Sequence, residues 1–412
     1  MKTSAVGETD PVKTDAMEAD LRAVGLAAQA PAFTKPPLRL KIAVLNRIFS
    51  PTGGGAERYS IALVEQLAAV HEVHVFAQEI HHQWPSVHYH RIAAAFKKPR
   101  WLNQLWYASA TRQATRHGFD IVHSHENVWH GNVHTMHVKT VQRSLFEGLK
   151  GLPLALRRLK VALSPRLLTY LGFERVRLGA RPGVAVVAAS QLLQAELLAQ
   201  YPHVVGRIST ITPGVAMPHR LTAQTDARRA LGVPADGPCI AFIANDYARK
   251  GLPTLLAAAQ GLPGVRVLVA GHPGQIARFK TLAHTLGIDQ RVHFVGPQAD
   301  IGVVYCAANL LAHPTLEDTF AMVVLEAMAH GLPVVVSASP YCGIAALLTD
   351  GENALLLSNP QDPQALQTAL QSILGNPSVH QRLSKAGYSF AQQHSWQAAA
   401  LQYQAVYDSL GA

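Results

Sequence analysis

The most diagnostic segment is residues 314–337, which read Pro-Thr-Leu-Glu-Asp-Thr-Phe-Ala-Met-Val-Val-Leu-Glu-Ala-Met-Ala-His-Gly-Leu-Pro-Val-Val-Val-Ser. The pattern predicts the end of a buried strand, an acidic turn, a short helix and a second buried strand. Glu317 and Asp318 stand where the first strand ends, and Glu326 lies about two helical turns further on. Open α/β sheets bind ligands at strand carboxyl ends, and helix N-termini attract phosphate. Acids there suit sugar hydroxyls, so the segment predicts a nucleotide-sugar site.

The spacing of the acids carries a family resemblance. Asp318 and Glu326 bracket seven residues, and the runs beginning at Phe320 and Gly331 stand in register with them. The arrangement resembles the signature of retaining glycosyltransferases of the GT-B fold, family 4. Relatives usually carry Glu at the first acidic position, so Asp318 departs from the pattern and Glu317 is an alternative first acid. The other interpretation is an ordinary helix capped by Asp318, with Glu326 in solvent.

The resemblance also assigns roles to these residues. It implies that Glu326 holds the ribose diol of the donor and that the acid at Glu317 or Asp318 holds the transferred sugar. It further implies that Phe320 and Ala321 contact the donor. Which of the two adjacent acids is the first motif acid stays open at this point.

Composition places the chain among globular proteins with two domains. The chain has 412 residues, of which 49% are hydrophobic and 15% charged, enough for two substantial cores. Cys239, Cys306 and Cys342 are odd in number and scattered, which suits core packing in a reducing compartment rather than disulfides or zinc. The sequence contains no apolar run of about 20 residues, so a membrane-spanning helix is not expected. We therefore expect a cytoplasmic protein.

Alternating buried-strand and amphipathic-helix patterns predict the fold class. Seven strand patterns lie between residues 40 and 212 and six between 239 and 357, which favours parallel sheets built from βαβ units. Together with the resemblance, this predicts an α/β protein of the GT-B type, with two doubly wound Rossmann-like domains that face a cleft. The predicted parts are a disordered tail at 1–38, an N-terminal acceptor domain at 39–215, a linker at 216–237, a nucleotide-sugar domain at 238–390, and a C-terminal helix at 391–412 that crosses back to the first domain.

A triple-glycine loop follows the first predicted strand. Gly53, Gly54 and Gly55 lie just before a predicted helix, and glycines allow a backbone to approach a ligand closely. A flexible connector is the alternative interpretation, because the loop is neither a Rossmann nor a P-loop motif. The resemblance implies that these glycines line the donor cleft.

A basic pair follows the first predicted strand of the second domain. Arg249 and Lys250, in the run Asn245-Asp-Tyr-Ala-Arg-Lys-Gly, stand just before a predicted helix. Cations oppose the helix dipole there, so a bound anion explains them better than solvent does. The resemblance implies that they neutralise the donor diphosphate during catalysis, and we therefore expect no metal and no other cofactor.

Histidines cluster before residue 138. His130, His134 and His137 have the spacing of a helical metal site, but the surrounding residues predict a strand that ends at His137, so a metal site is not favoured. The resemblance instead implies that His137 contacts the donor sugar near the acceptor hydroxyl. An ordinary buried histidine is the alternative.

Positive charge gathers in the first half of the chain. Residues 41–200 hold 19 basic and 9 acidic side chains, and residues 145–178 alone hold seven basic and two acidic ones among bulky apolar residues. Such a segment suits an anionic membrane surface, although a helix pair that packs on the first domain has the same composition. Nucleic acid is not expected, because no recognised binding module accompanies the charge.

Together with these observations, the resemblance implies a retaining glycosyltransferase, a metal-independent hexosyltransferase that uses a UDP- or GDP-sugar donor and a lipid-linked or saccharide hydroxyl acceptor. The pattern around His313-Pro-Thr and the basic first domain look most like enzymes of lipopolysaccharide core and related envelope polysaccharide synthesis, peripheral on the inner face of the cytoplasmic membrane. A nucleotide-sugar epimerase of the same general fold and a non-catalytic nucleotide-sugar binding protein are the alternatives.

Overall fold

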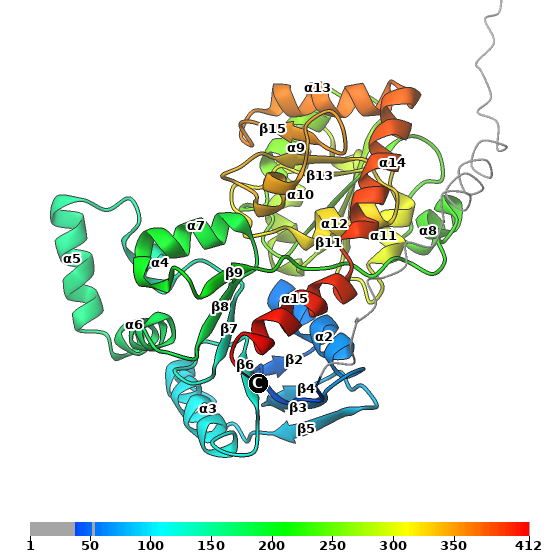
Figure 1. Ribbon diagram of the computed structural model, residues 1–412. Coiled ribbons are helices and arrows are strands. Elements are labelled where there is room, and N and C mark those ends of the chain that lie inside the picture. The colour runs from blue at the N-terminus through cyan, green and yellow to red at the C-terminus, as the bar shows by residue number, and fades with distance from the viewer. Residues whose placement is uncertain (1–37, 52–53, 412) are drawn as a thin grey trace, which may run out of the picture. The chain divides into compact units, whose positions relative to one another are not determined.

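The computed structural model describes residues 38–51 and 54–411, and its core consists of two parallel sheets (Figure 1). Apart from Leu38, the predicted tail at 1–38 lies outside the described residues, as does Gly53. Each sheet is doubly wound. The first strand in the chain lies in the middle of the sheet, and the next two strands extend from it to one edge. The chain then returns to the middle, and the following strands extend to the other edge. The predicted fold class is confirmed.

The first sheet has seven strands in the order β5-β3-β1-β6-β7-β8-β9, and all neighbouring pairs are parallel. Its direction of winding reverses between β1 and β6, so a crevice opens there at the strand carboxyl ends. Strands β2 and β4, which follow β1 and β3 in the chain, form a separate parallel pair. The bounds are β1 Lys41–Leu45, β2 Ile48–Phe49, β3 Glu72–Ala77, β4 Glu79–Ile80, β5 Val87–Arg91, β6 Ile121–Ser124, β7 Val133–Met136, β8 Ala185–Ala188 and β9 Ile208–Thr210.

The second sheet has six parallel strands in the order β12-β11-β10-β13-β14-β15, and its winding reverses between β10 and β13. Strand β10 is buried at every position, and β13 and β14 are buried throughout. Their apolar runs lie between helices on both faces, which explains why the sequence pattern marked them as strands. The bounds are β10 Cys239–Ala244, β11 Arg266–Gly271, β12 Val292–Gly296, β13 Leu310–His313, β14 Val334–Ser337 and β15 Leu355–Leu357.

Helices cover the faces of both sheets, and several begin at capping side chains. Asp362, Asn376 and Ser395 each accept a hydrogen bond from a backbone N–H in the first turn of α13, α14 and α15. The bounds are α2 Gly55–Leu67, α3 Arg100–Ala114, α4 Val141–Phe146, α5 Gly151–Ala162, α6 Pro165–Leu178, α7 Gln191–Gln200, α8 Gln224–Ala230, α9 Leu252–Gln260, α10 Ile276–Thr285, α11 Gly302–Ala307, α12 Met322–Ala329, α13 Pro363–Leu374, α14 Pro377–Gln393 and α15 Trp396–Asp408.

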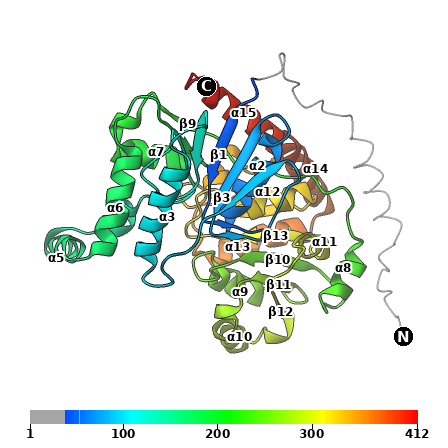
Figure 2. The same ribbon diagram turned by 90° about the horizontal axis from the view of Figure 1, so that it is seen from below.

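The chain crosses between the two sheets twice at one place. The backbone N–H of Val215 donates to the carbonyl of His394 at 2.8 Å, which pairs the outgoing segment with the returning one. Gly214 permits this contact, because a Cβ there would lie 2.4 Å from the backbone nitrogen of Trp396. After the crossing, α15 lies along α2 (Figure 1, Figure 2). Its aromatic side chains pack into the core of the first sheet.

The predicted linker at 216–237 is more ordered than its composition indicates. It contains helix α8, which packs against α11 of the second half of the chain. Arg228 fastens this helix, because its guanidinium donates to the carbonyls of Ala307 and Ala235 and to the side chain of Asn309. A helix of seven residues is too short to give a clear period in the sequence. Among the helices of the described residues, none has the length and apolar character needed to cross a bilayer.

Candidate active site

A cavity of about 670 Å³ lies where loops of the two sheets meet. The loops that line it follow β1, β7, β10 and β13, and three of these strands flank the points where the winding of the sheets reverses. Most of the predicted site residues lie on its wall, and several residues that the sequence did not mark join them. The residues that line the cavity include Gly54, Gly55, Arg58, Tyr59, His137, Lys139, Asp246, Arg249, Lys250, His313, Glu317, Asp318, Phe320, Ala321 and Met322.

Arg249 and Lys250 lie in the turn between β10 and α9. Gly251 begins the helix with a φ of 85°, and a Cβ there would lie 1.8 Å from the carbonyl oxygen of Pro314. The basic turn therefore packs directly against the loop that follows β13, and this contact requires glycine. The carbonyl of Arg249 accepts a hydrogen bond from the backbone N–H of Leu316, which fixes the two loops together.

The carboxylate of Asp318 is the centre of a buried polar cluster. Its Oδ2 accepts from the Lys250 ammonium at 2.6 Å and contacts His313 Nε2 at 3.0 Å. Its Oδ1 accepts from the backbone N–H groups of Phe320 and Ala321. Burial alone would raise the pKa of Asp318, but the hydrogen bond with His313 and the charge of Lys250 outweigh it and hold the pKa below its ordinary value. Asp318 is therefore an ionised anchor for Lys250.

Glu317, one residue earlier, has a different environment. Its side chain is 44% exposed, against 17% for Asp318. Its carboxylate lies 3.5 Å from the ammonium of Lys139, which follows β7. The carbonyl of Glu317 accepts a second hydrogen bond from Lys250 Nζ at 2.9 Å. The side chain of Glu317 thus faces the open cavity, while its backbone supports the basic turn.

The acidic turn ends at a residue in an unusual conformation. Ala321 has a φ of 75°, in the left-handed region that residues other than glycine rarely adopt. Such a residue costs of order 1 kcal/mol and persists only where its surroundings hold it. The hydrogen bonds from Phe320 and Ala321 to Asp318 supply that restraint. The buried Phe320 and Ala321 therefore form a fixed part of the cavity wall at the start of α12.

Glu326, predicted to contact the donor, is not among the residues that line the cavity. One of its oxygens pairs with Arg58 of α2 at 3.0 Å, and the other accepts from the hydroxyl of Tyr305 at 2.7 Å. The reason lies in a residue from the first half of the chain: Arg58 lines the cavity and covers the carboxylate. Glu326 thus forms an ion pair that joins α2 to α12, and its contact with the donor ribose stays a prediction.

The glycine loop meets the cavity at the N-terminus of α2. Gly54 is the capping position of the helix and Gly55 its first residue, and both line the cavity. A Cβ on Gly55 would lie 3.9 Å from the sulfur of Met322, so the loop approaches α12 of the other half. The predicted role of Gly53 lies outside the described residues.

His137 follows β7 and lines the cavity. Its Nε2 shares a hydrogen bond of 2.9 Å with Nδ1 of His125, and its ring packs edge-on against Tyr59 at 4.8 Å. Burial, and then the charge of Arg177, lower the pKa of His137 to about 3, so its imidazole is neutral near pH 7. A neutral ring can donate or accept a hydrogen bond but cannot serve as a fixed cation.

Four functional candidates escaped the sequence analysis: Arg58, Lys139, Tyr305 and His313 in the roles described above. Arg58 and Lys139 reach Glu326 and Glu317 from the other half of the chain, across more than one hundred residues of sequence. No local motif marks such partners. The His313-Pro-Thr run was visible in the sequence, but its hydrogen bond with Asp318 required the folded turn.

Two family models match this chain, side by side. The model described as Glycosyltransferase Family 4 matches residues 53–217, which hold the first sheet apart from β1. The model described as Glycosyl transferases group 1 matches residues 223–390, which hold the second sheet and the cluster around Asp318. The boundary between the matches lies in the segment between the crossing at Val215 and helix α8.

Curated relatives share part of the sequence. A D-inositol 3-phosphate glycosyltransferase of Corynebacterium urealyticum is 34% identical over 223 residues, which cover 50% of this chain and 51% of the relative. A protein of the same description from Mycolicibacterium smegmatis is 35% identical over 198 residues, covering 46% and 44%. The chain thus spans about half the length of the curated relatives it matches.

Solved structures share the fold over most of the chain. WaaG, a glycosyltransferase involved in lipopolysaccharide biosynthesis, is 19% identical with a TM-score of 0.76 over 89% of this chain and 99% of its own. Anabaena HepE, solved in complex with UDP and glucose, is 20% identical with a TM-score of 0.70 over 90% and 100%. With its two doubly wound sheets and both family models in place, the chain consists of a Glycosyltransferase Family 4 domain followed by a Glycosyl transferases group 1 domain, on the GT-B fold.

Proposed function

We propose that this protein transfers a hexosyl group from a nucleotide-sugar donor to a hydroxyl group of an acceptor, with retention of the anomeric configuration. The observation that carries the proposal is the placement of two cations and two carboxylates, Arg249, Lys250, Glu317 and Asp318, on one cavity wall where the winding of the second sheet reverses. A sugar diphosphate needs cations for its phosphates and carboxylates for its hydroxyls, and these groups lie side by side here.

The basic turn is suited to the diphosphate. Lys250 is held at a fixed point by Asp318 and by the carbonyl of Glu317, whereas Arg249 is more exposed and free to close on a ligand. Negative charge grows on the diphosphate as the glycosidic bond breaks, so preorganised cations stabilise the transition state more than the ground state. With this charge supplied by side chains, the reaction needs no metal ion.

The sugar would lie between the acidic turn and the end of β7. Glu317 is exposed to the cavity and can accept hydrogen bonds from sugar hydroxyls, and Lys139 opposite it can donate to the sugar or the acceptor. The neutral His137 can orient the sugar by hydrogen bonding. The acceptor oxygen attacks the anomeric carbon on the face from which the diphosphate departs, and the acceptor proton passes to the leaving phosphate oxygen.

The ribose would use Glu326, and this requires a rearrangement. Ribose hydroxyls reach the carboxylate of Glu326 when Arg58 turns away from it into the cavity. There the guanidinium adds a third cation near the diphosphate. The ion pair between α2 and α12 would thus open when the donor binds.

A UDP-sugar is the favoured donor and an envelope glycan precursor the favoured acceptor, with a GDP-sugar as the second choice of donor. HepE was solved with UDP and with UDP-glucose, and WaaG is described as an enzyme of lipopolysaccharide biosynthesis. The curated relatives act on an inositol phosphate by their description, so a phosphorylated small acceptor belongs in the same test.

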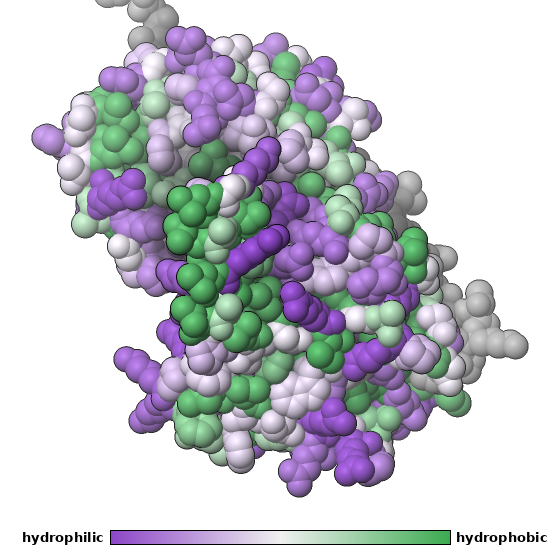
Figure 3. Space-filling model, turned by 90° about the vertical axis from the view of Figure 1, so that its left-hand side faces the viewer, coloured by the Kyte–Doolittle hydropathy of each residue, from purple (hydrophilic) through white to green (hydrophobic). Residues whose placement is uncertain are grey.

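We also propose that helix α5 docks on an anionic membrane. Leu152, Leu156 and Leu159 of α5 and the adjoining Leu163 are between 57% and 75% exposed, and their spacing puts them on one helical face. Figure 3 faces the side of the molecule where α5 lies and shows hydrophobic side chains beside strongly hydrophilic ones there. Cations beside an exposed apolar face are typical of helices that lie in a membrane interface.

One basic residue of this segment has a different role from the one predicted. Arg177, at the end of α6, is buried, and its guanidinium donates to the carbonyls of Thr135 at 2.7 Å and Ser124 at 3.4 Å. It fastens α6 to β6 and β7 and cannot reach a membrane. The docking surface therefore consists of α5 and its neighbouring exposed cations, and the acceptor it brings to the cavity would be lipid-linked.

The test is transfer of labelled sugar in excess EDTA. UDP-, GDP- and ADP-sugars are first compared by thermal shift, because a bound donor raises the melting temperature by mass action. The best donor is then incubated with lipid-linked, saccharide and inositol phosphate acceptors, and the anomeric configuration of the product is read by NMR. Transfer with retention is expected. Strict dependence on Mg²⁺ or Mn²⁺, inversion, or conversion of the donor without an acceptor would each overturn the proposal, the last in favour of an epimerase.

A further inference from the structure

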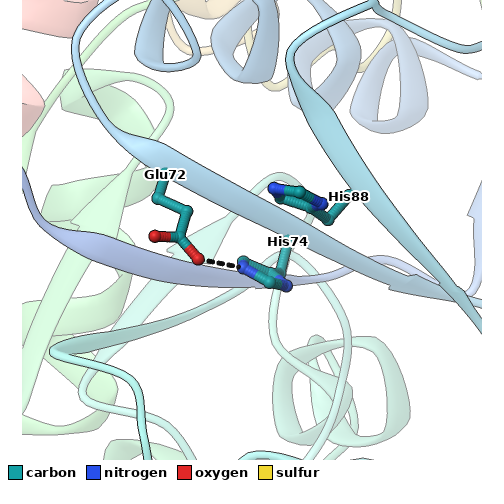
Figure 4. A group of neighbouring side chains, drawn as sticks. All are labelled: Glu72, His74 and His88. Atoms are coloured by element: carbon teal, nitrogen blue, oxygen red, sulfur yellow. Dashed lines mark hydrogen bonds and ion pairs between the residues drawn. The ribbon is translucent and has the colours of Figure 1, made fainter.

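A histidine-rich cluster lies on the first sheet, on residues other than those that line the cavity. Glu72 and His74 of β3 and His88 of β5 each bring one ligand atom within 4.8 Å of the others (Figure 4). The two strands are parallel neighbours, and His74 and His88 stand opposite each other in register. Alternate residues of a strand share one face, so Glu72 and His74 lie on the same face as well. The backbone thus places three potential ligands, one carboxylate and two imidazoles, side by side.

We propose that Glu72, His74 and His88 bind a divalent transition metal ion, with zinc as the best match to their chemistry. Two imidazoles and one carboxylate, with water in the remaining position, are a ligand set that zinc uses. Two ligand atoms on a tetrahedral zinc lie about 3.4 Å apart, given bonds of about 2.1 Å. The exposed His88 side chain has the freedom to close the difference between 4.8 Å and this distance, at most about 1.4 Å.

The surroundings of His74 resemble those of a metal ligand. Its Nε2 lies 2.9 Å from Glu72, and its Nδ1 lies 2.8 Å from Nε2 of His90. A ligating histidine commonly donates its second ring N–H to a neighbour that fixes the ring and its tautomer. His90 Nε2 lies within hydrogen-bond distance of His74 Nδ1 and can accept that hydrogen bond. The Phe119 ring packs edge-on against His74 at 5.2 Å and shields one side.

A competing cation gives the proposal a sharp test. The ammonium of Lys41, on β1, lies 3.0 Å from the same Glu72 oxygen that contacts His74. Lys41 is 41% exposed and can turn into water, but its charge opposes a metal ion at this point. Removing it should strengthen metal binding, whereas removing a ligand should weaken it.

The site would serve structure rather than catalysis. β5 is the edge strand of the sheet, and a metal held by β3 and β5 would tie that edge strand to its neighbour. None of the three ligands lines the cavity, so metal should change thermal stability without changing the rate of sugar transfer. The inference does not rest on the proposed function.

The experiment is a zinc titration of the tag-free, chelator-stripped full chain by calorimetry. We expect one zinc ion per chain, a rise in melting temperature on loading, and at least a tenfold loss of affinity in both His74→Ala and His88→Ala. Lys41→Met should raise the affinity severalfold. His88→Ala is the safer variant for folding, because that side chain is exposed.

The matched control is His82→Ala. His82 also sits beside a carboxylate, with its Nε2 2.7 Å from Glu65, but no second histidine completes a metal-binding group with that pair in the described residues. Its loss should leave zinc binding unchanged. Absence of zinc binding in the parent, affinity unaffected by His88→Ala, or equal losses in His88→Ala and His82→Ala would overturn the proposal, the last two as adventitious binding to surface histidines.

Discussion

At the scale of single residues, adjacent acids in one turn have opposite environments. Asp318 is ionised, mostly buried and bonded to Lys250, His313 and the backbone, whereas Glu317 faces the cavity. Both residues line the same cavity, but Glu317 pairs with Lys139 and is the more exposed, whereas Asp318 pairs with Lys250. The order of the two acids in the sequence therefore carries no information about which one meets the sugar.

Neutral isosteres should separate the two roles. Asp318→Asn leaves the Lys250 ammonium against an amide and should destabilise the fold by about 3 kcal/mol, because breaking a buried ion pair strands a charge. Glu317→Gln should leave the melting temperature almost unchanged and lower only the transfer rate. Scanning calorimetry and initial rates on both variants check this. Equal shifts in melting temperature would show that the environments have been assigned wrongly.

The ion pair of Glu326 predicts a split between stability and donor binding. Glu326→Ala should raise the KM for donor and reduce kcat/KM about a hundredfold, because two charge-assisted hydrogen bonds to ribose are lost. Its effect on stability should stay within about 1 kcal/mol, since Arg58 is part-exposed and can be solvated. Tyr305→Phe, which removes one hydrogen bond but keeps the carboxylate, is the control. A variant without Glu326 that keeps its donor KM would refute the ribose assignment.

Sequence reasoning reached the residues that lie in local motifs. Arg249, Lys250, Glu317 and Asp318 follow strands whose apolar runs are unmistakable, and their place at strand ends follows from the sheet topology. The position of Glu326 was not accessible in this way, because Arg58 covers it from α2. Contacts between distant elements have no signature in one sequence.

At the scale of elements, α5 is a helix that packs few of its own side chains: Val161 is its buried residue. Arg158→Gln/Lys160→Gln should reduce co-sedimentation with vesicles that contain anionic lipid, because each cation near such a surface contributes about 1 kcal/mol. Donor affinity should not change. Arg278→Gln/Lys280→Gln on α10 removes the same charge from an exposed helix of the other half and is the matched control. Equal binding of the two double variants, or binding insensitive to about 0.5 M salt, would argue against docking through α5.

Buried histidines in β6 and directly after β7 oppose folding when they are protonated. Burial, first of all, lowers the pKa values of His123 and His137 to about 3, below the value of 6.5 expected in the unfolded chain. The unfolded state therefore binds more protons below pH 6.5, so stability is complete above that pH and is lost as the pH falls toward 3. At pH 5 each histidine costs about 2 kcal/mol.

The melting temperature should accordingly fall steeply between pH 6.5 and pH 5. Calorimetry across this range measures the slope. His137→Gln removes one titrating group and should flatten the slope, even if it lowers the melting temperature at pH 7.5. A slope identical to that of the parent would mean that His137 is not held neutral by burial.

Elements with strong patterns were predicted, and the weak ones were not. Strands such as β10 and β14 are fully buried and read as continuous apolar runs. Helix α8 escaped because its seven residues span about two turns and its anchor, Arg228, is a charged residue that the pattern places in solvent. In the basic segment 145–178 the composition was misleading at Arg177, whose partners are backbone carbonyls of β6 and β7.

At the scale of the whole molecule, the core of the first sheet is completed from the other end of the chain. Trp396, Tyr403 and Tyr407 of α15 are buried in it, and the hydroxyl of Tyr403 bonds with Tyr59 at 2.9 Å and Thr135 at 2.7 Å. A chain truncated after Ser395 should lose several kcal/mol of stability, at roughly 1.5–3 kcal/mol for each large side chain no longer buried. Truncation after Ser409, which keeps α15, should be tolerated. Soluble yield and melting temperature distinguish the two, and equal stability would contradict the role of α15.

The location of α15 also bears on how the protein is made. A ribosome delivers the chain from its N-terminus, and domains generally fold as they emerge. Here the first sheet is synthesised well before α15, which is translated after every other described element. Until α15 is translated, the surface that it covers on the first sheet stays exposed. Tyr59 then lacks its hydrogen-bond partner Tyr403, and His123 lacks its partner Tyr407. The nascent first half is thus the stage most exposed to aggregation and most dependent on a chaperone, and a synonymous change that slows translation between the two halves would lengthen that stage.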